Sequence, residues 1–491
     1  MLLANLPALQ VVLPLIAAPI CLLIRRSDRA WFWATIVTWF CLGISICLLM
    51  EVLSGGAISY PIGDWAAPIG IEYKIDLLSA FLLVIVSSIG AVVLPYAHAS
   101  VSSEIPEARI YLFYTMYLLC LCGLLGIAVT GDAFNLFVFL EVSSLSSYVL
   151  ISMGRYRRSL TAAYRYLIMG TVGATFYIIG VGMMYMMTGT LNMADLANRI
   201  PAVAETRTIQ VAIAFIVVGL SLKLAIFPLH MWLPNAYTFA PSVVTIFLAA
   251  TATKVAVYAL LRMIFTVFGG DPLFVIGEVL MILSVAAMFV GSLVAIYQTN
   301  IKRMLAYSSI AQIGYMVLGI SFITTTGLAG GIIHLFNHAL VKGALFMAVG
   351  GMFFRIASVR LDDMAGIGKR MPITTGCFVI AGLGLIGVPL TAGFISKWYL
   401  VLAALEKEMW LIAVLILISS LLAVIYIWRV VEVAYFRAPP KRASVISEPP
   451  LSMLIPLFIL TGASIYFGID AGRTVDIAMA AAKFLMIGVA Q

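Results

Sequence analysis

Residues 131–154 read GDAFNLFVFLEVSSLSSYVLISMG, a run that carries a single charged residue, Glu141, after Asp132 at its start. A helix needs about 20 predominantly apolar residues to span a bilayer. A charge at the centre of such a helix costs at least about 2.5–3.5 kcal/mol. The stretch therefore predicts a membrane-spanning helix whose carboxylate has a partner or serves a function.

The composition extends this prediction to the whole chain. Of its 491 residues, 63% are hydrophobic and 10% are charged, and the mean hydropathy is +1.12. A soluble globular protein carries about 25% charged residues. Because the chain has too few charges to cover a water-facing surface of this size, we interpret it as one polytopic membrane domain.

Other classes of protein are disfavoured. The net charge of +8 could indicate a nucleic-acid partner, but no basic stripe interleaved with aromatic residues occurs. The six cysteines lie in apolar segments without a CxxC pair, which is typical of buried hydrophobic residues rather than of a metal site. No phosphate loop, nucleotide fingerprint or nucleophile elbow is present. We expect no cofactor, no metal, no nucleic acid and no catalytic residue.

Runs of spanning length recur along the chain and predict an all-α membrane protein with about fourteen transmembrane helices. No positive residue precedes the first run, so we interpret it as a retained helix rather than a cleaved signal peptide. The runs lie at about 3–24, 30–53, 75–97, 109–130, 133–153, 162–188, 207–227, 241–266, 272–297, 303–323, 327–354, 373–400, 409–436 and 450–468.

Loop charges predict the orientation of these spans. With the N-terminus outside, the inner loops hold 17 Lys and Arg residues and the outer loops hold 6. Positive residues concentrate in cytoplasmic loops. This asymmetry favours a bacterial plasma-membrane protein with both termini on the periplasmic face. The tail, 474–491, is predicted to form a short amphipathic helix at the outer interface.

Several ionisable residues lie too deep in their runs to reach the interface. Arg262 and Arg429 lie near helix ends, and we expect them to snorkel. The others need partners or water, and they suit a proton path because burial disfavours their charged forms. The alternative is that they only hold helices together as buried ion pairs. These candidates are Glu141, Lys223, Lys254, His334, His338, Lys342 and Lys397.

His334, His338 and Lys342 are spaced at i, i+4 and i+8, so a helix places them on one face. A zinc site could use the two histidines, but no third ligand is evident. A titratable stripe fits better because histidine changes charge near neutral pH. Core histidines capped by hydroxyl groups remain the structural alternative.

Two spans, the seventh and the twelfth, carry helix-breaking residues close to Lys223 and Lys397. Interrupted helices at matching positions are typical of transporters built from repeats. Because the two spans are five apart, the repeats would have inverted topology: 109–266 for helices 4–8 and 272–436 for helices 9–13. They would follow helices 1–3 at 1–108 and precede helix 14 and the tail at 437–491. The expected hinge residues are Pro228, Pro234, Pro241, Gly387 and Pro389.

Five stretches resemble the antiporter-like subunits of the proton-conducting membrane transporter family, which includes the D subunit of the Mrp cation/proton antiporters and several subunits of respiratory complex I. The resemblance covers about residues 70–435 and implies fourteen helices, two inverted five-helix repeats and a hydrophilic axis at mid-membrane. The stretches are GDAFNLFVFLEVSSLSSYVLI, LKLAIFPLHMWLPNAYTFAPSVVTIFLAATATKVAVYALLR, IKRMLAYSSIAQIGYMVLG, HLFNHALVKGALFMAVG and GLIGVPLTAGFISKWY.

The resemblance implies roles for the buried groups. Glu141 matches the glutamate of helix 5 and Lys223 its lysine partner on broken helix 7, while Lys254 and Lys397 match the lysines of helices 8 and 12. The histidines match those of helix 11. Complex I subunits often carry a histidine where this chain has Ala249, a departure that favours the Mrp group.

We therefore expect a proton-translocating subunit of a multisubunit Na⁺/H⁺ antiporter, not an enzyme in itself. Its partners would be other membrane subunits, protons, Na⁺ or another monovalent cation, and lipid. One alternative is the same machinery inside complex I or a membrane-bound hydrogenase. Another is a stand-alone carrier for an organic solute, which predicts a roomy polar pocket at the midplane.

Overall fold

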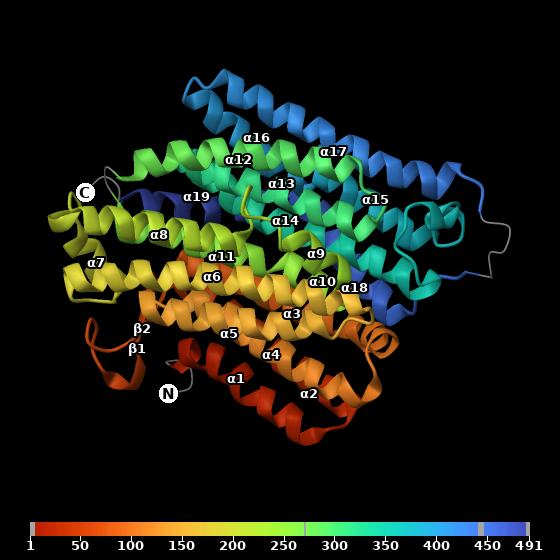
Figure 1. Cartoon of the computed structure of the whole chain (residues 1–491), viewed down its shortest axis with the longest axis horizontal. Helices are drawn as coiled ribbons and strands as arrows, with labels where there is room; N and C mark the ends of the chain where they lie inside the picture. The colour runs from red at the N-terminus through yellow and green to blue at the C-terminus, as the bar shows by residue number, and fades with distance from the viewer. Residues whose placement is uncertain (1–4, 270–271, 440–445, 488–491) are drawn as a thin grey trace.

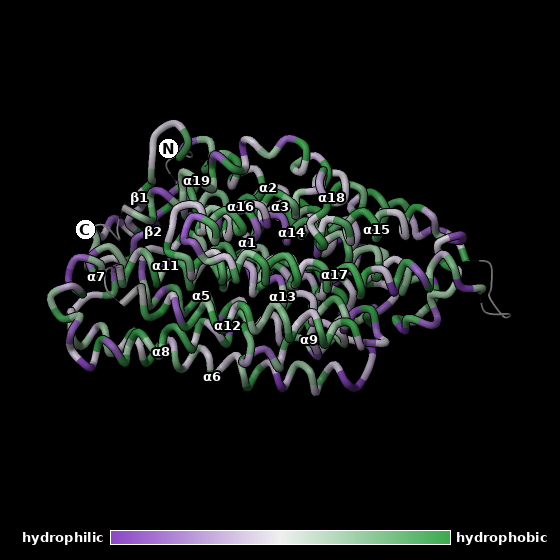
Figure 2. The backbone as a smooth tube through the Cα atoms, turned by 90° about the horizontal axis from the view of Figure 1, so that it is seen from above, coloured by the Kyte–Doolittle hydropathy of each residue, from purple (hydrophilic) through white to green (hydrophobic). Residues whose placement is uncertain are grey.

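The computed structural model describes residues 5–269, 272–439 and 446–487, which form a bundle of long helices (Figure 1). The predicted segment ends at 3–4 and 488–491, and loop residues Lys441 and Arg442, lie outside the described residues. Among the described residues, thirteen helices are long and apolar enough to cross a membrane. Hydrophobic residues line the helices, and hydrophilic residues concentrate near their ends (Figure 2). The predicted all-α polytopic fold is confirmed.

The unbroken spans follow the predicted runs closely, as their bounds show. They are α1 (Leu6–Ile24), α2 (Ser27–Gly55), α3 (Leu77–Glu104), α4 (Glu107–Val129), α5 (Ala133–Ser152), α6 (Arg157–Thr188), α12 (Pro272–Ile296), α13 (Ile301–Ser321), α14 (Thr325–Ile356), α17 (Trp410–Phe436) and α18 (Leu451–Ile469).

Smaller elements lie between and after the spans. A β-hairpin that the sequence did not predict pairs β1 (Ile58–Pro61) with β2 (Glu72–Ile75) in antiparallel register. Helix α7 (Met193–Arg199) connects α6 to the seventh span. Helix α19 (Gly472–Ile487) is the predicted tail helix, and it packs its buried face against α3 and α14. The hairpin and α7 lie at the same end of the bundle as the start of α1 and the end of α19 (Figure 1).

The seventh span is broken, as predicted. Helix α8 (Arg207–Leu224) ends where Ala225 adopts a left-handed φ of 62°, and α9 (Leu233–Phe239) resumes after eight residues without α-helix. Of the predicted hinge residues, Pro228 lies within the break and Pro234 lies in the first turn of α9. The span therefore continues beyond the predicted end at residue 227.

The eighth span is divided as well, which the sequence did not predict. It consists of α10 (Ser242–Ala250) and α11 (Ala252–Arg262), which meet at Thr251, followed by a π-helical turn (Met263–Phe268). The predicted hinge Pro241 is the N-cap of α10. Thr251 leaves the helical conformation with φ −125° and ψ −61°, although neither proline nor glycine adjoins it.

The twelfth span contains the second predicted helix break. Helix α15 (Pro372–Ile386) ends at Gly387, whose φ of 88° is left-handed, and α16 (Ala392–Glu406) begins after a turn that contains Pro389. Glycine adopts this conformation without strain. Together, α15 and α16 cover the twelfth predicted span, 373–400.

We predict that Gly393→Ala disrupts this break. Its Cβ would overlap the carbonyl oxygen of Gly384 on the opposing half-helix, so the two half-helices would have to separate. A lowered temperature of thermal unfolding of the purified protein is the expected result. Gly376→Ala is the matched control, because nothing lies within 4 Å of its added Cβ. Equal stability of the two variants would contradict the close approach described here.

Packing places the predicted ionisable residues on a continuous series of helices. Helix α6 packs between α5 and α8, and α8 packs against α11. Helix α10 then packs against α14, which packs against α16. Figure 1 shows these helices between α1 and α2 at one side of the bundle and α17 at the other. The fold therefore brings residues from distant parts of the sequence into one row across the bundle.

Candidate functional site

Glu141 and Lys223 form an ion pair within the helix bundle. The Lys223 ammonium donates to Glu141 Oε1 at 2.9 Å and to Ser144 Oγ at 2.8 Å. The Lys223 side chain is 4% exposed and that of Glu141 is 21% exposed. Lys223 lies in the last turn of α8, directly before the break. The ion pair therefore joins α5 to the part of α8 that adjoins the break.

A small cavity lined by both apolar and polar side chains lies beside Lys223. It has a volume of about 20 Å³, enough for one water molecule. Its lining includes Ser144 and Ser147 of α5 and Thr253 of α11. Thr253 Oγ1 lies 3.5 Å from the ammonium of Lys254. Thr253 therefore lines the cavity beside Lys223 and also contacts Lys254.

Lys254 and Lys342 are buried, and neither has a carboxylate partner in the part of the chain that the structure describes. The Lys254 ammonium donates to the carbonyl of Ala249 at the end of α10. Lys342 donates to the carbonyl of Leu305 at 2.8 Å and to the hydroxyl of Ser308 on α13. Both lysines are 0% exposed. Among the described residues, neutral oxygens are the hydrogen-bond acceptors that offset the cost of burying these ammonium groups.

His334 and His338 lie on one face of α14, as their spacing predicted. Their rings are nearly parallel, at 7°, with centroids 6.1 Å apart. His334 Nδ1 forms a hydrogen bond of 2.8 Å with Ser396 Oγ, next to Lys397. His334 Nε2 and both ring nitrogens of His338 are buried and have no protein partner among the described residues. Such nitrogens need water to satisfy them, which favours a hydrated row over a dry core.

Lys397 completes the row at the second broken span. Its ammonium donates to the carbonyl oxygens of Leu385 and Ile386 and to Ser420 Oγ. It also lies 4.9 Å from the centroid of the Tyr315 ring. In this arrangement, all seven predicted ionisable residues are brought to the interior of the bundle. Whether they relay protons stays a prediction at this point.

The serine partners of the lysines were not singled out from the sequence, although a signal for them exists. The segment LEVSS at 140–144 recurs as LAYSS at 305–309, with Ala306 in place of Glu141. Ser144 and Ser308 each accept a hydrogen bond from a buried lysine. In this alignment Ser308 matches Ser143 and Ser309 matches Ser144, so the recurrence marks a serine pair near each lysine and not the individual serine that binds it.

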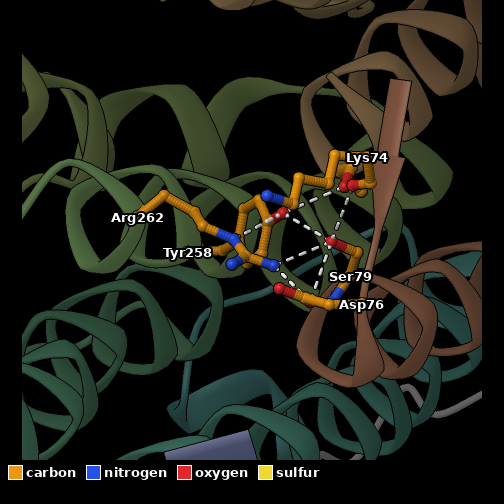
Figure 3. A network of polar contacts seen from close by, with 6 residues as sticks. Lys74, Asp76, Ser79, Tyr258 and Arg262 are labelled. Carbon is orange, nitrogen blue, oxygen red and sulfur yellow. Dashed lines mark hydrogen bonds and ion pairs between the residues drawn. The ribbon is translucent and has the colours of Figure 1, made fainter. Parts of the chain in front are cut away.

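The expectation that Arg262 snorkels to the interface is wrong. Arg262 donates to Asp76 and to Ser79 Oγ, and its Nε donates to Tyr258 at 3.0 Å (Figure 3). The two ion-paired side chains are 9% and 7% exposed. Tyr258 in turn donates to the carbonyl of Ala128 at 2.9 Å. A partner 186 residues away in sequence therefore keeps the arginine inside the bundle.

Asp76 also caps α3, because it accepts a hydrogen bond from the backbone N–H of Ser79 at 3.0 Å. Burial would raise the pKa of this carboxyl group, but the Arg262 guanidinium and the bonds from Ser79 outweigh burial and lower it. Asp76 is therefore ionised at neutral pH. This network ties the start of α3, directly after β2, to the end of α11.

Comparison with known proteins gives a family match. Residues 130–423 match the family model described as NADH:quinone oxidoreductase/Mrp antiporter, transmembrane. The N subunit of NADH-quinone oxidoreductase from Desulforudis audaxviator (strain MP104C) is 42% identical over 93% of this chain and 94% of its own length. The D subunit of the Na⁺/H⁺ antiporter from Alkalihalophilus pseudofirmus (strain OF4) is 33% identical over 87% of this chain and 86% of its own.

Two solved structures are similar along nearly the whole chain. A chain of the Mrp complex from Dietzia sp. DQ12-45-1b gives a TM-score of 0.91 at 25% identity, covering 99% of this chain and 98% of its own. A chain of an archaeal membrane-bound sulfane sulfur reductase gives 0.92 at 30% identity, covering 98% of each. Both structures are of membrane complexes.

Proposed function

Since this chain belongs to the NADH:quinone oxidoreductase/Mrp antiporter transmembrane family, we propose that it is the proton-translocating subunit of a multisubunit Na⁺/H⁺ antiporter. The observation that carries the proposal is the ion pair of Glu141 and Lys223 at the end of broken helix α8. A lysine beside a carboxylate favours its charged form, and the same lysine without it favours the neutral form. Moving α8 relative to α5 therefore makes Lys223 take up or release a proton.

The released proton passes along the row of buried groups. The cavity beside Lys223 allows one water molecule to reach Thr253, which contacts Lys254. The unpartnered histidine nitrogens of α14 accept and donate protons between Lys254 and Lys342 on one side and Lys397 on the other. The breaks at Pro228 and Gly387 let the two lysine-bearing helices shift without disturbing the rest of the bundle.

A second candidate function is supported by the relative that is 42% identical. In that case the chain would be an antiporter-like subunit of a redox-driven complex, and electron transfer in partner subunits would move the same row of residues. The first candidate is favoured by relatives described as the D subunit of Na⁺/H⁺ antiporters and by Ala249, which lies where complex I subunits often carry a histidine.

The chain works in a bacterial plasma membrane, with its hairpin end on the periplasmic side. The excess of 17 over 6 basic residues in the loops of the opposite end supports this orientation. The chain is embedded in lipid and assembled with other membrane subunits, as the similar chain of the Mrp complex is. In this assignment it is a secondary transporter subunit, not an enzyme.

The experiment uses the complete complex, expressed with its partner subunits in a strain that lacks its own Na⁺/H⁺ antiporters. Everted membrane vesicles are energised so that their interior becomes acid, and a pH-sensitive dye follows the gradient after Na⁺ is added. We expect Na⁺ to collapse the gradient without an electron donor to the complex itself. The redox alternative is supported instead if Na⁺ has no effect and proton pumping needs electron transfer within the complex.

A further inference from the structure

Among the described residues, the ammonium group of Lys397 contacts uncharged groups only, which are three oxygen atoms and an aromatic ring. Its Nζ lies 2.7 Å from the carbonyl oxygen of Ile386, 3.1 Å from that of Leu385 and 2.8 Å from Ser420 Oγ. The face of the Tyr315 ring is on another side of it. We call the three oxygens and this ring the Lys397 cradle. Carbonyl and hydroxyl oxygens around a single positive charge are also the ligands that an alkali cation uses in proteins.

The break in the twelfth span creates this cradle. The last carbonyls of a helix have no intrahelical partner, and they form the negative end of its dipole. The backbone N–H groups of Gly387 and Val388 both donate to Leu383. The carbonyl oxygens of Leu385 and Ile386 are thus free to accept from a cation. In this structure that cation is the ammonium of Lys397, which lies beyond the break. The cradle is a site for one positive charge, whichever group supplies it.

Lys397 differs from Lys223 in lacking a carboxylate. Among the described residues, no ion pair includes Lys397. The titratable groups that face it are Tyr315 on α13 and His334 on α14, the latter through Ser396. The other helices packed against α16 are α15, α17 and α18. In the described part of the chain, none of them places a charged group in hydrogen-bonding contact with the Lys397 ammonium. No fixed negative charge therefore holds the ammonium in place.

We propose that the Lys397 cradle binds Na⁺ in competition with the protonated side chain of Lys397. This proposal rests on the proposed function and identifies the site at which the transported cation meets the proton. When Lys397 releases H⁺ towards His334, its neutral amine no longer supplies a positive charge to the cradle. Na⁺ then binds to the two carbonyl oxygens and to the Ser420 hydroxyl. The site holds one positive charge before and after the exchange.

Electrostatic repulsion makes the two occupants exclusive. Two unit charges a few ångströms apart in a buried site repel each other by several kcal/mol, even at an effective dielectric constant of about 20. An empty cradle would leave the carbonyl oxygens without a partner at membrane depth, which is also costly. One cation must therefore replace the other, which is the coupling that an antiporter needs.

The cradle lies next to the surface of this chain. Leu390, in the same break, is 69% exposed. Non-helical backbone at membrane depth must be covered by protein or reached by water. Binding is therefore tested on the whole complex, in which this face has its native surroundings.

The first test measures the Na⁺ concentration that gives half-maximal exchange in vesicles carrying the whole complex. We expect Ser420→Ala to raise it about tenfold, the effect of losing one ligand worth about 1.4 kcal/mol. Ser284→Ala is the control, because this buried serine of α12 donates to the carbonyl of Met281 on its own helix and not to the cradle. An unchanged Na⁺ dependence in Ser420→Ala would overturn the proposal while leaving the antiporter function intact.

The second test measures retention of radioactive ²²Na⁺ by the purified complex at several pH values. In the unsubstituted complex, lower pH should reduce retention, because protonated Lys397 fills the cradle. We expect Lys397→Met to remove that pH dependence and to abolish exchange. If the retention of Na⁺ by Lys397→Met falls with pH as before, the competition proposed here is wrong. If the unsubstituted complex shows no Na⁺-dependent exchange at all, the proposed function itself fails.

Discussion

Glu141→Ala is expected to abolish Na⁺-dependent proton exchange while the complex still assembles. Among the described residues, the substitution leaves Ser144 as the remaining hydrogen-bond partner of the Lys223 ammonium. A buried lysine without a counter-charge favours its neutral form, so it can no longer alternate between two protonation states. The exchange assay in everted vesicles measures the loss, and native gel electrophoresis of the detergent-solubilised complex checks assembly.

Conservative substitutions separate the charge of Glu141 from its shape. Glu141→Asp keeps a carboxylate at a shorter reach and should retain part of the exchange, whereas Glu141→Gln keeps the size but not the charge and should retain none. Ser146→Ala is the control on the same helix, because its hydroxyl donates within α5, to the carbonyl of Val142. Normal exchange in an assembled Glu141→Gln complex would show that the carboxylate charge is not needed.

Lys223→Ala should be as inactive as Glu141→Ala, and the double substitution should be no worse. Residues that act as one unit give non-additive effects, which a double-mutant cycle detects. The isolated Glu141 carboxylate of Lys223→Ala is 21% exposed in the present structure, so this variant should assemble as readily. Additive losses would instead indicate two independent roles.

The sequence predicted those features that have a high energetic cost in a membrane. Glu141 and the four buried lysines are conspicuous because a charge in an apolar run requires a partner. The break at Gly387 was predictable because glycine and proline disfavour continuous helix there. These arguments located the row of ionisable residues and both lysine-bearing breaks before any contact was known.

Partners that come from distant segments could not be predicted in the same way. Neutral carbonyl and hydroxyl groups, such as those around Lys397, carry no signature in composition or spacing. The division of the eighth span at Thr251 follows from tertiary contacts, since no proline or glycine causes it. Arg262 was misread because its position near a helix end suggested the interface, whereas Asp76, far away in sequence, keeps it buried.

Asp76→Asn should destabilise the protein by about 3–5 kcal/mol, the usual cost of leaving one partner of a buried ion pair unpaired. Asparagine is as good an N-cap as aspartate, so the cap of α3 onto Ser79 is retained and only the charge is lost. The Arg262 guanidinium would then face neutral partners alone, Ser79 and Tyr258 among them. Thermal unfolding of the purified complex, followed by a thiol-reactive or intrinsic fluorescence signal, measures the loss.

Two controls distinguish an ion-pair effect from a general effect of substitution. Asp195→Asn removes the carboxylate from an ion pair in which the Asp195 side chain is 22% exposed and the Arg199 side chain is 48% exposed. It should cause only a small fraction of the loss of stability expected for Asp76→Asn. Combining Asp76→Asn with Arg262→Leu removes the orphaned charge and should recover much of the stability. If Asp76→Asn and Asp195→Asn unfold at the same temperature, the Asp76–Arg262 pair does not stabilise the junction of α3 and α11. Recovery in the double variant would show that the lost stability comes from the unpaired buried charge of Arg262. The free-energy cost of an unpaired buried charge also explains why Glu141 is paired with Lys223.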